Sequence, residues 1–133
     1  MQRTTLAWAS IILLSAVALG AFGAHGLKDH FPPEAIGQWK TGVEYQFYHG
    51  LALLGLAALA DRIDRYSLRW IRLMFLLGVL CFSGSLYLLS TRYLLNLHNI
   101  TPILGPITPI GGLFFIAGWA LLLITALRSN DDR

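Results

Sequence analysis

The first long apolar stretch of the chain reads TTLAWASIILLSAVALGAFGAHG, from Thr4 to Gly26. It contains no charged residue and follows directly on Arg3. Because a helix rises about 1.5 Å per residue, about 20 residues are enough to cross the roughly 30 Å hydrocarbon core of a bilayer. The apolar part of a cleaved signal peptide covers only about 7 to 15 residues. The stretch therefore predicts a membrane-spanning helix that is retained in the protein.

The composition of the whole chain also indicates a membrane protein. Hydrophobic residues make up 56% of its 133 residues and charged residues only 13%, whereas soluble domains average about 25% charged residues. The net charge of +3 does not indicate nucleic acid as a partner, because the Lys and Arg residues lie between long apolar runs. Cys81 is the single cysteine, and no His/Cys pair has metal-ligand spacing. We therefore expect a lipid bilayer as partner, and neither a metal nor a cofactor.

Three further apolar runs follow, so the fold class predicted is an all-α integral membrane protein, a bundle of four transmembrane helices in one domain. The predicted spans cover residues 5–25, 41–60, 73–91 and 110–127. The stretch from Tyr93 to Pro109 contains four helix breakers: Pro102, Gly105, Pro106 and Pro109. Proline inside a helix removes a backbone donor and clashes with the preceding turn. We therefore expect this stretch to be a connection and not part of one continuous helix.

The distribution of Lys and Arg predicts the orientation. If the N-terminus is cytoplasmic, the inner side holds seven of these residues: Arg3, Arg62, Arg65, Arg69, Arg72, Arg128 and Arg133. The outer side then holds three: Lys28, Lys40 and Arg92. Cytoplasmic loops of membrane proteins carry the excess of Lys and Arg. We therefore expect both termini to be cytoplasmic (N-in/C-in).

The predicted inner loop has a basic face. At 100° per residue, four arginines would share one side of a helix: Arg62, Arg65, Arg69 and Arg72. One interpretation is a short interfacial turn that holds anionic lipid headgroups. The other, which we favour, is that these arginines only determine the topology.

Four separated motifs carry a family resemblance. They are ALGAFGAH (18–25), GVEYQFYH (42–49), FSGSLY (82–87), and TPIGG (108–112) with AGWA (117–120) after it. In this order they resemble the small bacterial inner-membrane family known as domain of unknown function 423, the YgdD-like proteins. The resemblance covers nearly the whole chain. It implies a small multi-span protein of the bacterial inner membrane, and it implies no reaction, because the family has no established activity.

The predicted topology places polar side chains from all four helices at a similar depth, in the outer half of the membrane. This candidate cluster comprises His25, Glu44, Gln46, Tyr48, His49, Ser83, Ser85 and Thr108. A charged side chain at the membrane centre costs about 2.5–3.5 kcal/mol on insertion scales, and less near the boundary. We therefore expect Glu44 to point into the bundle, with His25 or His49 as its partner.

Several interpretations of the candidate cluster remain open. It is either a hydrogen-bonded plug that fixes the helix register, a pocket for a quinone or lipid headgroup, or a path for a proton or solute. The chain contains no catalytic motif, since its serines lack an acid–base pair at a known spacing. We therefore expect a protein that is not an enzyme, an accessory or structural subunit that packs against other membrane proteins or itself. The alternative is a small-molecule binder or carrier.

Overall fold

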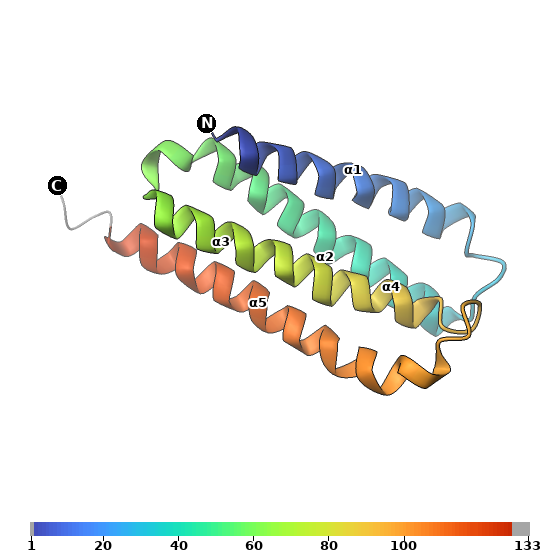
Figure 1. The fold of residues 1–133 in the computed structure, drawn as a ribbon. Helices are drawn as coiled ribbons and strands as arrows, with labels where there is room; N and C mark the ends of the chain where they lie inside the picture. Colours follow the sequence, from blue (N-terminus) through green and yellow to red (C-terminus); the bar gives the residue numbers. More distant parts are fainter. Residues whose placement is uncertain (1, 129–133) are drawn as a thin grey trace.

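The computed structural model describes residues 2–128, which are helical with short connections and contain no strand. The helices are α1 (Arg3–His25), α2 (Pro33–Ala58), α3 (Arg65–Gly78), α4 (Gly84–Ser90) and α5 (Thr101–Arg128). A π-helical segment, η2 (Val79–Ser83), joins α3 and α4 into one rod, and short 3₁₀ turns form η1 (Ala60–Arg62) and η3 (His98–Ile100). The chain thus folds into four long rods that alternate in direction (Figure 1).

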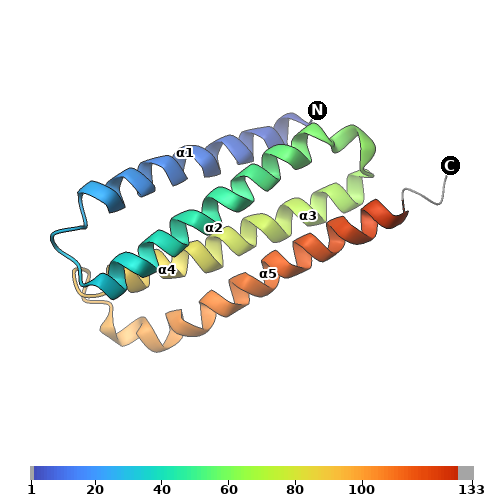
Figure 2. The same ribbon diagram turned by 180° about the vertical axis from the view of Figure 1, so that it is seen from behind.

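The four rods lie side by side in the order in which the chain forms them (Figures 1 and 2). α1 packs chiefly against α2, α2 against η2 and α4, and α5 against α3 and η2. α1 and α5 therefore lie at opposite edges of the array, where most of their surface is exposed. The start of α1 and the end of α5 lie at the same end of the molecule.

Three segments of the described residues are long and apolar enough to cross a membrane: 3–25, 65–90 and 98–128. α2 is not among them, although its 26 residues are about 39 Å long. The helix carries Lys40, Glu44, Gln46 and His49, which lower its mean hydropathy. An all-helical protein with membrane-spanning helices is confirmed, and the fourth span stays a prediction.

The prediction that residues 93–109 form a connection is wrong from Thr101 onward, whereas residues 93–100 do connect α4 to α5 through turns and η3. α5 begins at Thr101 and contains Pro106 and Pro109 in its interior, so it starts nine residues before the predicted span. Each of these prolines removes one backbone donor, but the helix continues past both, and its first part is bent in Figure 1. Prolines are tolerated in membrane helices when neighbouring groups satisfy the freed carbonyls. α2 also begins earlier than predicted, at Pro33, where proline suits the first helical turn.

Two apolar clusters hold the rods together. The larger one joins α1, α2, α3 and α5 and is made of Ala9, Leu53, Leu56, Leu68, Ile71, Phe75, Val79 and Phe115. The smaller one closes the opposite end of the α1–α2 pair, where Leu27 and Phe31 of the connecting loop pack against Ala35, Trp39 and Val43. The buried loop residues fix the angle at which the chain turns from α1 into α2.

The turn between α2 and α3 is stabilised by a helix cap. The Asp64 carboxylate accepts a hydrogen bond of 2.9 Å from the Ser67 backbone N–H, which has no partner within the helix. Hydrogen bonds from the Ser67 side chain and from the Ser67 backbone N–H lower the pKa of Asp64, because they stabilise the charged carboxylate. α3 therefore begins immediately after Asp64, and Arg65–Arg72 form its first two turns.

Candidate functional site

Gln46 joins three helices near the middle of the molecule. Its side-chain N–H groups donate to the Ile12 carbonyl oxygen (3.0 Å) and to Ser15 Oγ (2.7 Å) on α1. Its carbonyl oxygen accepts a hydrogen bond of 2.6 Å from the Tyr87 hydroxyl on α4. Both halves of the buried amide are therefore satisfied by groups of the bundle itself, as buried polar groups in a membrane require.

Two buried serines make a second set of contacts between helices. Ser83 Oγ, in η2, donates to the Gly42 carbonyl oxygen of α2 over 2.7 Å. Ser85 Oγ lies 2.6 Å from Thr108 Oγ1 of α5 and also donates to the Phe82 carbonyl oxygen. The absence of a side chain at Gly42 leaves room for the ring of Tyr87, because a Cβ there would stand 2.9 Å from that ring. These contacts hold the rod formed by α3, η2 and α4 against α2 on one side and α5 on the other.

His49 is enclosed by aromatic rings and uses both of its ring nitrogens. Its ring stacks on Phe115 with the centroids 3.5 Å apart, and Phe75 meets it edge-on at 5.3 Å. Nδ1 lies 2.8 Å from the Tyr45 carbonyl oxygen, which can only accept, so Nδ1 carries the proton. Nε2 then accepts the hydrogen bond of 3.1 Å from Trp119 Nε1. Neither nitrogen is free to bind a haem iron or another metal.

The expected inward position of Glu44 is wrong. Glu44 is exposed on α2, and no other group of residues 2–128 forms a hydrogen bond or ion pair with its carboxylate. Residues 44 and 46 differ by about 200° around a helix, so α2 cannot bury both on one face. The buried face contains Gln46, with Gly42 and Gly50 above and below it, because glycines let the neighbouring helices approach there.

The remaining members of the candidate cluster lie apart from its buried part. His25 is exposed at the last turn of α1 and is therefore not a partner of Glu44 or His49. Tyr48 is 54% exposed, and its ring contacts that of Tyr45 edge-on at 5.7 Å. The structure thus divides the cluster into separate contacts centred on Gln46, Ser83, Ser85 and His49, with Glu44, His25 and Tyr48 outside them.

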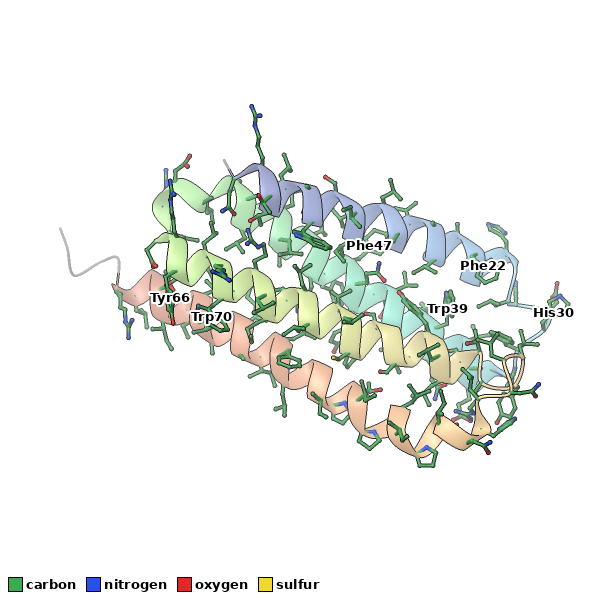
Figure 3. All side chains as sticks on the ribbon, in the orientation of Figure 1. Phe22, His30, Trp39, Phe47, Tyr66 and Trp70 are labelled. Carbon is green, nitrogen blue, oxygen red and sulfur yellow. The ribbon has the colours of Figure 1, made fainter. Side chains whose placement is uncertain are left out.

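A groove between the second half of α1 and the first half of α2 contains Glu44. It encloses about 380 Å³ and is lined by Gly20, Gly23, Ala24, Leu27, Ile36, Trp39, Lys40, Val43, Glu44 and Phe47. Trp39 and Phe47, which Figure 3 labels, can be followed along the α1–α2 pair. The Trp39 ring packs directly on Gly23, where a Cβ would stand only 2.5 Å from the ring. Trp39 Nε1 donates a hydrogen bond of 2.9 Å to the Leu19 carbonyl oxygen. The groove is apolar apart from the charged ends of Lys40 and Glu44.

The predicted basic face is divided in a similar way. Arg62 in η1 and Arg65 and Arg69 at the start of α3 are exposed. The rings of Tyr66 and Trp70, which Figure 3 labels, meet edge-on in the same part of α3. Arg72 is half-buried and donates to Gln2 Oε1 (3.0 Å) and Thr5 Oγ1 (3.1 Å). Arg72 therefore joins α3 to the start of α1 and does not share the surface of the other three arginines.

Several contact residues were not in the predicted cluster. Ser15, Tyr87 and Trp119 supply hydrogen-bond partners to Gln46 and His49. Tyr87 and Trp119 belong to the FSGSLY and AGWA motifs, so the motifs could have indicated their importance. Ser15 lies within an apolar run, and no motif around it indicates a contact. Within residues 2–128, no group of three or more His, Cys, Asp or Glu side chains is placed to hold a metal ion.

Comparison with known proteins assigns the chain to a family. A family model described as "Protein of unknown function (DUF423)" matches residues 19–112. The UPF0382 membrane protein YwdK of Bacillus subtilis is 41% identical over 120 residues, which are 90% of this chain and 92% of that protein. The UPF0382 inner membrane protein YgdD of Escherichia coli is 41% identical over 127 residues, 96% of this chain and 92% of that protein.

A UPF0382 membrane protein of Staphylococcus haemolyticus is 39% identical over 119 residues, which are 90% of this chain and 91% of that protein. No solved structure matches the chain. The family match covers most of the chain, and these relatives match it over nearly their whole length. The resemblance seen in the four sequence motifs is thereby confirmed, and the chain belongs to the DUF423 family of membrane proteins.

Proposed function

We propose that this protein is a non-catalytic accessory or structural subunit of a membrane assembly in the bacterial inner membrane. The observation that carries the proposal is that the buried polar members of the candidate cluster are hydrogen-bonded within the bundle itself. Each of these side chains forms a hydrogen bond to a neighbouring helix, and the bonds lie in separate places; the side chains are Gln46, Ser83, Ser85 and His49. Such contacts fix the packing of helices and leave no convergent set of free groups for chemistry.

The proposal includes four spans with both termini in the cytoplasm. α2 falls short of the other three rods in hydropathy because of its polar side chains. Gln46 and His49 are nevertheless buried and hydrogen-bonded, so they would not face lipid. The cost of inserting α2 is therefore lower than its composition indicates, which supports a fourth span. The excess of arginines at the start of α3 supports a cytoplasmic position for that end.

The alternative function, a small-molecule binder or carrier, needs the polar groups to converge on one cavity or path. His25, Glu44 and Tyr48 lie outside the buried contacts, and both nitrogens of His49 are occupied. A proton path would also need titratable groups along the bundle interior, whereas Glu44 is exposed on the outside of α2. The division of the cluster therefore favours the structural role.

Native mass spectrometry of the protein, extracted gently from its own membrane, tests the proposal. We expect a stoichiometric complex with at least one different membrane protein, because an accessory subunit stays bound to the assembly it supports. A particle without any foreign subunit that carries one defined small molecule per chain would contradict the proposal. That result would favour the binder or carrier.

A further inference from the structure

The α1–α2 groove presents two charges of opposite sign on an otherwise apolar surface. Lys40 and Glu44 are both exposed on α2, one helical turn apart, and both line the groove. Within residues 2–128, neither side chain forms an ion pair. The other walls offer no acceptor or donor side chain besides Trp39, whose N–H is already bonded to the Leu19 carbonyl oxygen.

The contacts between α1 and α2 show how deep these charges lie. A Cβ on Gly20 would stand 3.3 Å from Val43 Cγ1, so Glu44 lies at about the level of Gly20. Gly20 is five residues before the end of α1, which places Glu44 about 8 Å below the outer end of that helix. If the chain spans the membrane as proposed, this carboxylate lies within the hydrocarbon region, where an uncompensated charge is expensive.

The order of the two charges does not favour a pair within one chain. Lys40 precedes Glu44 by four residues, and the reverse order, Glu before Lys, is the more stabilising one on a helix. The two side chains are not paired in the structure. A partner that supplies an ammonium to Glu44 and a carboxylate to Lys40 would compensate both charges.

We propose that this partner is a second copy of the chain, seated on the groove so that Lys40 of each copy pairs with Glu44 of the other. A two-fold axis normal to the membrane keeps every residue at its own depth in both copies. Lys40 of each copy then lies one helical turn, about 6 Å, above Glu44 of the other copy, and the lysine stem is long enough to span that rise. The inference rests on the proposed four-span topology, which places Glu44 in the bilayer.

Co-purification of two differently tagged copies from native membranes tests this contact. We expect wild-type copies to co-purify, and Glu44→Lys copies or Lys40→Glu copies to associate with themselves at least about tenfold less, because all charges at the contact then repel. A mixture of one Glu44→Lys chain and one Lys40→Glu chain should recover association. In that mixture each variant supplies the charge that the other lacks, which pairing within a single chain cannot achieve.

Two further variants keep the test interpretable. Glu34→Lys adds the same positive charge to the exposed first turn of α2, outside the groove, and should associate like the wild type. Glu44→Gln removes the pair without adding charge and should weaken association without perturbing insertion. Gel filtration and circular dichroism of each variant show whether it remains folded.

Three results would overturn the proposal: wild-type copies that do not co-purify, single charge variants that self-associate like the wild type, or a mixture that gives no recovery. If wild-type copies do not co-purify and the monomer retains a phospholipid or a foreign helix in the groove, that ligand and not a second copy occupies the groove. Each of them leaves the accessory role intact, since that role is judged by a foreign subunit and not by the tagged copies.

Discussion

Gln46 and Glu44 lie two positions apart on α2 and have opposite surroundings. The Gln46 amide uses its oxygen and its N–H groups in hydrogen bonds to α1 and α4, whereas the Glu44 carboxylate is exposed in the groove. The uncharged residue thus holds the bundle together, and the charged residue is available to a partner. Their contributions to stability should therefore differ in size.

We predict that Gln46→Leu lowers the free energy of unfolding by about 1–3 kcal/mol, because the half-buried Tyr87 hydroxyl loses its acceptor. Glu44→Gln should change it by less than about 0.5 kcal/mol, as expected at an exposed site. Equilibrium unfolding in detergent micelles measures both variants. Adding Tyr87→Phe to Gln46→Leu should cost little more, since it removes the orphaned hydroxyl. Equal effects at positions 44 and 46 would contradict this assignment.

At the scale of elements, the close approach of α5 to the π-helical segment η2 depends on one glycine. A Cβ on Gly111 would stand 2.3 Å from the Phe82 backbone nitrogen and 2.7 Å from its Cα. Backbone atoms cannot rotate away as a side chain can, so a larger residue would force the two rods apart. The next residue, Gly112, has its nearest such atom, Phe82 Cδ2, at 4.0 Å.

Gly111→Ala should therefore destabilise the protein by about 1–3 kcal/mol through overpacking. Gly112→Ala, the matched control, should be neutral or slightly stabilising, because alanine favours the helix and meets no clash. Thermal unfolding of the two variants in the same detergent compares them directly. The packing of α5 on η2 would be contradicted if both variants unfolded at the wild-type temperature.

At the scale of the whole molecule, the even number of rods places the start of α1 and the end of α5 at the same end of the array (Figure 1). The exposed Arg62, Arg65 and Arg69 lie at that end too, on the turn between α2 and α3 and the start of α3. If these arginines remain in the cytoplasm, both termini are cytoplasmic.

We predict that a fluorescent reporter fused after Arg133 is active and that a phosphatase, which folds only outside the cytoplasm, is inactive at the same site. A phosphatase fused after His30, in the loop between α1 and α2, should be active, which controls for the reporter. An active phosphatase at the C-terminus would refute the orientation and, with it, the depth assigned to Glu44.

Sequence was sufficient for the helical class, the membrane environment and the family. These depend on local properties, such as the length of an apolar run or the presence of a motif, and no tertiary contact is needed to read them. It was less reliable at the helix ends, since α5 passes through Pro106 and Pro109. A proline costs a helix one donor and some strain, and only the surrounding packing decides whether the helix continues.

Which polar residues are buried was decided by the tertiary structure alone. α1 and α5 are apolar on nearly every side, so their periodicity does not show which face meets a neighbour. On α2 the polar residues Glu44, Gln46 and His49 are spread around the helix. α1 and α4 cover Gln46, and rings of α3 and α5 cover His49, whereas Glu44 stays outside. The expectation that a charged residue must point into the bundle therefore fails for Glu44, because burial depends on which faces of α2 the neighbouring helices cover.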